Sequence, residues 1–147
     1  MIKTLDKWIT EYENKTGEKH TVPIAGHLRL YYVPDRGYAE ISLIDGCVVI
    51  YETCGDAQFW HDFGVILCQE NNRKYLMTVC IRAIEPYIRF WKWKINFRHY
   101  NKDEGYLDRA TGTNQYDKSL TIGVAWKRNN AKSEKERYAY YVQSEVN

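Results

Sequence analysis

The sequence predicts a single α+β domain in which helices flank a mixed, mainly antiparallel β-sheet. The length of 147 residues is typical of one domain. The hydrophobic fraction of 44% is high enough for a buried core. Segments with helical periodicity also alternate with strand-like segments up to residue 98. Residues 99–147 show only strand and turn patterns, so we expect a β-rich extension after a core formed by residues 27–98.

The first helix is predicted directly after Thr4, a residue type that caps helix N-termini well. Gly17 is a suitable end. Between them the apolar residues recur every three or four positions and make one face: Leu5, Trp8, Ile9 and Tyr12. A strand is then expected over residues 27–33, and the turn-forming residues 34–37 end it.

A β-hairpin is the clearest local pattern. Residues 38–44 alternate between apolar and polar side chains, and Asp45-Gly46 is a strong two-residue turn signal. The strand after this turn, 47–53, is apolar on both faces, which is typical of a central strand. We therefore predict that 38–44 pairs with 47–53, and that 47–53 also pairs with the buried strand 75–81.

Two more helices are expected around the strand 75–81. The first begins at Asp56, ends at Asn71-Asn72 and carries an apolar stripe formed by Phe59, Trp60, Phe63, Ile66 and Leu67. The second is short and covers residues 84–90, with Pro86 tolerated in its first turn. Further strands are expected near 105–109, 120–127 and 138–143, and the charged segment 128–137 is predicted to be a mobile loop.

Basic and aromatic residues alternate from Trp91 onward, and no acid occurs between residues 86 and 102. A two-residue period would turn the aromatic rings to the core and place Lys92, Lys94 and Arg98 on one outer face. Such a stripe could bind an acidic partner, either nucleic acid or a nucleic-acid-binding protein. The alternative is the solvated face of an edge strand, where lysines prevent unwanted pairing.

Charge and cysteine content narrow the class of protein. Residues 1–85 have 9 Lys and Arg against 12 Asp and Glu, a net −3, whereas residues 86–147 have 12 against 7, a net +5. The basic second half permits an acidic partner.

The four cysteines form no C-x-x-C pair and are expected as buried, reduced thiols, so no metal site is predicted. We find no apolar run long enough to span a membrane and no signal peptide, and we expect a cytoplasmic protein.

A strand that runs into glycine and a helix N-terminus, as in Glu52-Thr53-Cys54-Gly55-Asp56-Ala57, is a favourable place for a phosphate. The spacing of Glu52, Gly55 and Ala57 resembles the Gln/Arg-x-x-Gly-x-Gly/Ala turn of the GNAT superfamily of N-acyltransferases. The segment 82–93 looks like a shortened form of that family's following helix motif. The resemblance covers residues 27–98. It departs from the family pattern at Glu52, at Asp56, which puts a carboxylate at the phosphate position, and at Lys92, where the family has glycine.

The resemblance implies a GNAT-like sheet and transfer of an acetyl group from acetyl-CoA to an amine. The cofactor would be bound by Thr53, Cys54, Gly55, Asp56, Ala57 and Arg82, with its pyrophosphate at the backbone N–H groups of residues 55–57. Tyr87 would protonate the departing thiolate, and Glu40 or Glu52 would act as general base. The bland alternatives are a packed tyrosine and solvated carboxylates. A different function also remains open: a non-enzymatic phage or mobile-element protein that blocks a host nucleic-acid-associated defence protein or binds nucleic acid.

Overall fold

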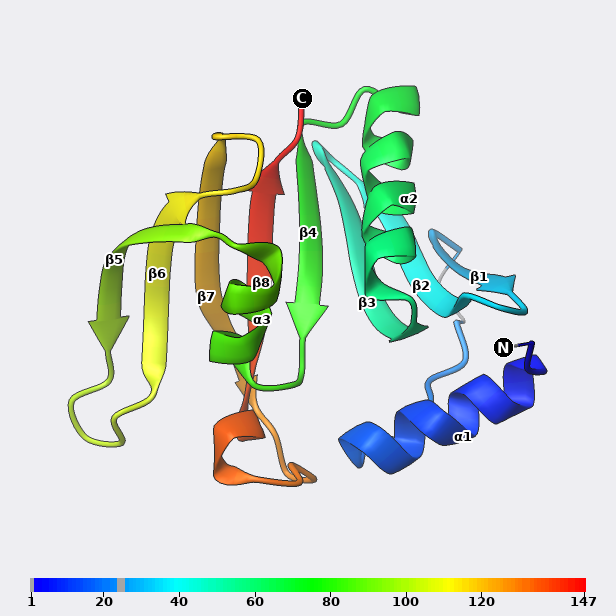
Figure 1. Ribbon diagram of the computed structural model, residues 1–147, viewed down its shortest axis with the longest axis horizontal. Helices are drawn as coiled ribbons and strands as arrows, with labels where there is room; N and C mark the ends of the chain where they lie inside the picture. The colour runs from blue at the N-terminus through cyan, green and yellow to red at the C-terminus, as the bar shows by residue number, and fades with distance from the viewer. Residues whose placement is uncertain (1, 24–25) are drawn as a thin grey trace.

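The computed structural model describes residues 2–23 and 26–147 and contains one eight-stranded sheet with three α-helices (Figure 1). In chain order the elements are α1 (Leu5–Thr16), β1 (Leu28–Val33), β2 (Gly37–Ile44), β3 (Cys47–Gly55), α2 (Ala57–Glu70), β4 (Tyr75–Cys80), α3 (Ile84–Trp91), β5 (Lys94–Tyr100), β6 (Leu107–Thr113), β7 (Ser119–Lys127), a short 3-10 helix (Glu134–Glu136) and β8 (Tyr138–Glu145). The predicted α+β class is confirmed, as are the elements expected before residue 91.

The strands lie in the order β1-β2-β3-β4-β8-β7-β6-β5. All neighbouring pairs are antiparallel except β3 and β4, which are parallel. The predicted hairpin and the predicted pairing of its second strand with β4 are both confirmed. The C-terminal residues are β-rich as expected, but they continue the same sheet, because the last strand, β8, lies directly beside β4.

The parallel pairing of β3 and β4 is short. It runs from the pair Cys47 and Tyr75 to the pair Ile50 and Thr78. Beyond that point β3 continues to Gly55 and stays paired with β2 on its other side, where Gly55 is opposite Gly37. Within the described part of the chain, residues 51–55 of β3 do not pair with β4. A gap therefore opens inside the sheet between these two strands.

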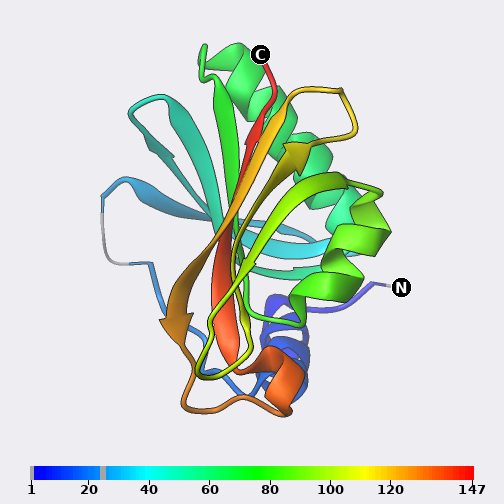
Figure 2. The same cartoon turned by 90° about the vertical axis from the view of Figure 1, so that its left-hand side faces the viewer.

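Helices α2 and α3 cover the same face of the sheet, as the two side views show (Figures 1 and 2). The core under α2 includes Trp60, Val48, Ile50 and Leu76, whereas the core under α3 includes Ile88, Trp91, Ile122 and Val142. Helix α1 packs elsewhere, against the ends of β2 and β3, where Trp8 and Tyr12 meet Tyr38 and Cys54. The described residues therefore form three apolar clusters, and the gap between β3 and β4 lies among them.

The stripe predicted for α2 is partly wrong. Ile66 is 52% exposed, and the buried residues are Trp60, His61, Gly64 and Cys68. The helix turns Gly64 toward the sheet, where it lies very close to Leu76 and Ile50. A Cβ at Gly64 would lie 2.8 Å from a methyl of Leu76, so a larger residue would require these side chains to shift.

The prediction of a single basic stripe on residues 91–98 is wrong. Trp91 ends α3, and Lys92 is its left-handed C-cap with φ of 56°, a conformation that favours glycine. The strand begins only at Lys94, next to Ile95, which packs against the α3 core. A bulge after Ile95 shifts the register, and Arg98 then pairs with Glu85 of α3. Lys94 and Arg98 therefore lie on opposite faces of β5.

The segment 128–137, predicted to be a mobile loop, is built around a buried charge. The side chain of Arg128 is fully buried and contacts the C-terminal end of α1, the residue after β4 and the short 3-10 helix. Sequence periodicity does not reveal this role, because the partners of Arg128 are up to 112 residues away. The last three strands start or end within a few residues of the predicted ranges.

Candidate active site

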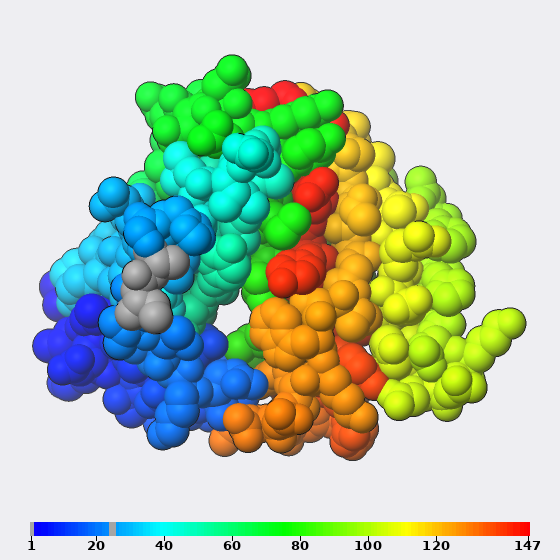
Figure 3. All heavy atoms as spheres, turned by 180° about the vertical axis from the view of Figure 1, so that it is seen from behind, coloured from blue at the N-terminus to red at the C-terminus, as the bar shows by residue number. Residues whose placement is uncertain are grey.

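A cavity of about 570 Å³ occupies the gap where β3 separates from β4. Its walls come from the second half of β3, the end of β4, the C-terminal end of α1, the start of α2 and the second half of α3. Trp126 of β7 also lines it. Seen from behind, an opening lies between the teal atoms of β3 and the orange atoms near the end of β7 (Figure 3). The cavity is large enough for a small ligand or the arm of a cofactor.

The cavity brings together eight of the nine side chains expected from the sequence to catalyse or to bind a cofactor. They are Glu40, Glu52, Thr53, Cys54, Gly55, Ala57, Arg82 and Tyr87. Asp56 is the exception. These residues come from β2, β3, α2, α3 and the loop after β4, and only the separation of β3 from β4 makes a common space for them.

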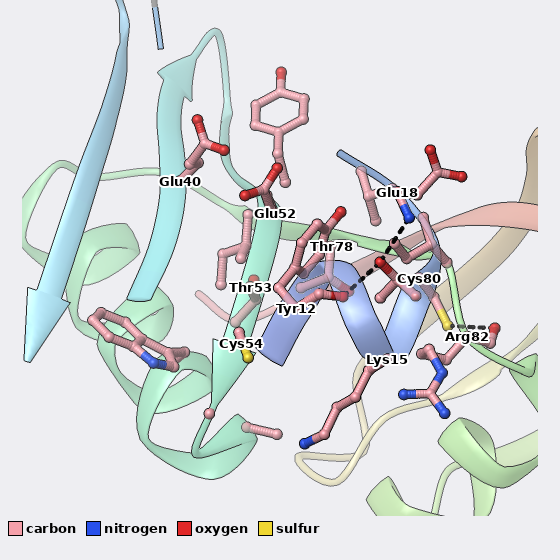
Figure 4. Close-up of a pocket in the computed structure, with 18 of the residues that line it drawn as sticks. Tyr12, Lys15, Glu18, Glu40, Glu52, Thr53, Cys54, Thr78, Cys80 and Arg82 are labelled. Atoms are coloured by element: carbon pink, nitrogen blue, oxygen red, sulfur yellow. Dashed lines mark hydrogen bonds between the residues drawn. The ribbon is translucent and has the colours of Figure 1, made fainter. Parts of the chain in front are cut away.

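The upper end of the cavity in Figure 4 is acidic. Glu40 of β2 and Glu52 of β3 lie side by side there (Figure 4). His20, from the loop between α1 and β1, hydrogen-bonds through Nδ1 with Glu52, and its Nδ1 lies 3.9 Å from Oε1 of Glu40. The Tyr38 hydroxyl donates to Glu52 at 2.7 Å, and the backbone N–H of Thr21 donates to its other oxygen at 3.2 Å.

Glu40 is the most unusual group in this cluster. The residue is only 2% exposed, and within the described part of the chain its Oε2 atom has no hydrogen-bond partner. Burial raises the pKa of Glu40, and the negative charge of Glu52 raises it further. The predicted alternative for Glu40, a solvated surface carboxylate, is therefore wrong. A buried carboxylate without a full set of partners is costly for stability, and such groups are typical of functional sites.

The opposite end of the cavity is basic. Lys15 of α1 and Arg82 after β4 both point to this end (Figure 4). Each has an acidic neighbour: Lys15 lies 3.5 Å from Glu11, and Arg82 lies 3.0 Å from Glu136. Lys15 and Arg82 remain half-exposed, with side-chain exposures of 56% and 52%. Both cations are therefore accessible to an anionic group at this end of the cavity.

Of the three N–H groups expected to bind the pyrophosphate, that of Asp56 is already bonded within the chain. The N–H of Asp56 donates to the carbonyl of Arg36 at 2.9 Å. The Asp56 carboxylate caps the helix by accepting from the N–H of Phe59 and pairs with the Arg36 guanidinium at 2.6 Å. Both bonds lower the pKa of Asp56. The prediction that the N–H of Asp56 binds phosphate is therefore wrong.

The backbone geometry at this junction also explains why residue 55 is glycine. Its φ is 115°, and a Cβ there would lie 2.1 Å from the carbonyl oxygen of Arg36. The backbones of Gly37 and Gly55 pack directly on one another where β2 and β3 end. Glycine at this position therefore allows the two backbones to pack closely. The sequence pattern of strand, glycine and helix is the same for such packing and for phosphate binding.

Tyr87 and two thiols complete the wall. The Tyr87 hydroxyl lies 3.5 Å from Oγ1 of Thr78, a long contact, and burial raises the pKa of Tyr87 to about 12. All four cysteines are free and buried, as predicted. Burial raises the pKa of Cys54 and of Cys80 to about 12, so both stay protonated and are poor nucleophiles at neutral pH. Tyr87 is thus an available proton donor, whereas the thiols are not activated.

Sequence reasoning missed His20 and Tyr38 as parts of the site. His20 lies in a loop, 20 residues before Glu40 and 32 before Glu52, and no motif links the three. The alternation of β2 marks Tyr38 only as a strand residue. The expected partner-binding residues Lys92, Lys94 and Arg98 do not line the cavity.

Searches of family models, of curated proteins and of solved structures find no match to this chain. Within residues 2–23 and 26–147, no helix is long and apolar enough to cross a membrane. The cavity and the side chains around it are therefore the features that indicate a function.

Proposed function

We propose that this protein is an N-acyltransferase that moves an acetyl group from acetyl-CoA to an amine bound in the cavity between β3 and β4. The observation that carries the proposal is the cavity itself: it joins an acidic end, a basic end and a half-buried tyrosine at the gap in the sheet. The GNAT-like sequence features at residues 52–57 and 82–93 agree with this proposal, since both segments contribute to the cavity wall.

The charge distribution suits the two substrates. The diphosphate of acetyl-CoA would lie at the mouth beside Lys15 and Arg82, and its pantetheine arm would enter the gap. A volume of about 570 Å³ can hold the arm and the acetyl group, while the nucleotide would stay on the surface. The acceptor amine would bind at Glu40 and Glu52, because a cation is stabilised by buried carboxylates.

The chemistry needs one base and one acid. The bound ammonium group first gives one proton to a carboxylate of the pair Glu40 and Glu52. The neutral amine nitrogen then attacks the thioester carbonyl carbon, and the C–N bond forms as the C–S bond breaks. The thiolate leaving group takes a proton from Tyr87, and the second proton of the nitrogen returns to Tyr87 through solvent. Backbone N–H groups on the unpaired edge of β3 could stabilise the oxyanion.

The proposal is tested first by binding. Calorimetric titration with acetyl-CoA should show one site per chain, and Arg82→Gln should bind about tenfold more weakly, because one charge-assisted contact contributes roughly 1.5 kcal/mol or more. The matched control is Arg89→Gln, an exposed arginine on α3 that does not line the cavity. A wild-type protein that does not bind acetyl-CoA at millimolar concentration would remove the proposal.

Activity is measured by release of free thiol in the presence of a panel of primary amines. Tyr87→Phe should lower kcat by roughly 10²-fold or more, because it removes the proton donor while leaving the ring in place. Acetyl-CoA binding by this variant should stay near wild type. Unchanged kcat in Tyr87→Phe would exclude this residue as the acid.

A further inference from the structure

We infer that His20, Glu40 and Glu52 form a binding site for a divalent transition-metal ion such as Zn²⁺ or Mn²⁺. Each side chain offers one ligand atom, and the three atoms lie within 4.8 Å of one another. In the described part of the chain, no other group of three histidine, cysteine or acidic side chains comes together in this way. The site shares Glu40 and Glu52 with the proposed acyl transfer, but ion binding can be measured without acyl-CoA.

Burial distinguishes the cluster from an acidic surface patch. Glu40 is 2% exposed, and the side chains of Glu52 and His20 are 9% and 14% exposed. Two carboxylates this close repel each other when both are ionised. A doubly charged cation would balance both carboxylates at once.

The unpartnered oxygen of Glu40 independently favours a bound ion. Within the described residues, Oε2 of Glu40 has no hydrogen-bond donor, although this carboxylate is buried within the cluster. Buried polar atoms in folded proteins nearly always have a partner, and a bound ion can satisfy an oxygen that no donor reaches. The three ligand atoms lie within 4.8 Å of one another, so one ion between them could contact all three; Zn²⁺ binds such ligands at about 2.0–2.2 Å.

The surrounding groups hold the proposed ligands in place. Tyr38 and the backbone N–H of Thr21 donate to Glu52, and the backbone N–H of His20 donates to Glu13 at 2.9 Å. Such outer contacts are typical of metal sites, where they orient the ligands. Glu40 and Glu52 also line the cavity, so a coordination position left open by three protein ligands would face it.

The donor set decides the class of ion. One imidazole nitrogen with two carboxylates suits Zn²⁺, Mn²⁺ or Fe²⁺, whereas Ca²⁺ prefers six or more oxygens and Mg²⁺ keeps most of its waters. A bound ion would occupy the carboxylate oxygens that accept the amine proton. It would therefore compete with the acceptor amine in the reaction proposed above.

The test is calorimetric titration of EDTA-treated and dialysed protein with Zn²⁺ and with Mn²⁺, with Mg²⁺ and Ca²⁺ for comparison. We expect one transition-metal ion per chain and a melting temperature that rises with its concentration. His20→Ala, Glu40→Gln and Glu52→Gln should each bind at least tenfold more weakly. Tyr38→Phe should bind about tenfold more weakly, because it removes an orienting contact to Glu52.

Two control variants exclude binding elsewhere. Glu11→Gln removes a partly buried acid that pairs with Lys3 and Lys15. Cys54→Ser removes a thiol in the cavity wall. Both variants should bind the metal ion with wild-type affinity. If Glu40→Gln fails to fold in EDTA, His20→Ala decides, since His20 lies in a loop outside the sheet. The inference is overturned if wild type binds neither ion at millimolar concentration, or if His20→Ala and Glu52→Gln bind as tightly as wild type.

Discussion

Replacement of Arg128 by methionine should destabilise the protein strongly, although the residue lies in a charged, glycine-free loop far from any motif. The Arg128 guanidinium is fully buried. Its Nε donates to Glu18 at 3.1 Å, and Nη2 donates to the carbonyl of Thr16 at 2.5 Å. Nη1 donates to the carbonyls of Ile81 and Glu136. One side chain thus joins the end of α1, the end of β4 and the segment between β7 and β8.

The expected loss is about 3–5 kcal/mol, the usual cost of breaking a buried charged network by removing one partner. Methionine retains the length of the stem and removes every donor. Three backbone carbonyls and the carboxylate of Glu18 would then lose their partner, and each buried acceptor left unsatisfied costs about 1–3 kcal/mol. Water can reach Glu18, whose side chain is 28% exposed, so the carbonyls should dominate.

Urea unfolding followed by tryptophan fluorescence measures the change in the free energy of unfolding. The control is Arg82→Met, because Arg82 pairs with Glu136, one of the residues that Arg128 also contacts, but is 52% exposed. It should cost no more than about 1 kcal/mol. If Arg128→Met costs less than about 1 kcal/mol, or no more than Arg82→Met, the buried network does not hold these segments together.

Three further substitutions test other parts of the structure. Gly55→Ala should lower the free energy of unfolding by about 1–3 kcal/mol or more, because φ is positive there and a Cβ would lie 2.1 Å from the Arg36 carbonyl oxygen. The control is Gly46→Ala, where φ is also positive but the space is open; it should cost clearly less in the same urea experiment. Burial lowers the pKa of His61, so the neutral imidazole contributes stability above the unfolded pKa of about 6.5, and this contribution is lost as pH falls through that value. In His61→Gln the loss of unfolding free energy between pH 7.5 and 5.5 should therefore be smaller than in wild type. An equal loss in both proteins would contradict this role of His61. Asp56→Asn keeps the helix cap and removes one charge, so it should change stability by less than about 1 kcal/mol and leave acetyl-CoA affinity unchanged by calorimetry; tighter binding would instead place the pyrophosphate at the N-terminus of α2.

Much of the fold was predictable because it depends on neighbouring residues. The hairpin of β2 and β3 follows from alternation around Asp45-Gly46, and α1 follows from the Thr4 cap and the Gly17 stop. Turn chemistry and periodicity act within a few residues, so they can be read directly from the chain. The same is true of the strand-glycine-helix junction at Gly55, where the structure also shows close backbone packing against Arg36 and Gly37.

The candidate site was predictable only in part. Glu40, Glu52 and Tyr87 were expected from the family resemblance, and they do line one cavity. His20 was not expected, because a single histidine in a loop carries no pattern. The basic stripe failed for a related reason: the bulge after Ile95 is decided by pairing with β6, and the ion pair of Arg98 with Glu85 is decided by the position of α3.

By itself, the sequence determined the class of the fold, most of the helices and strands, the hairpin and the reduced state of the cysteines. Only the tertiary structure decided that β8 lies beside β4, that β3 and β4 separate after Ile50, and that His20 meets Glu40 and Glu52. The physical reason is the range of the interactions. Caps, turns and periodicity are local, whereas strand order and buried polar contacts depend on the packing of surfaces that lie tens of residues apart in the chain.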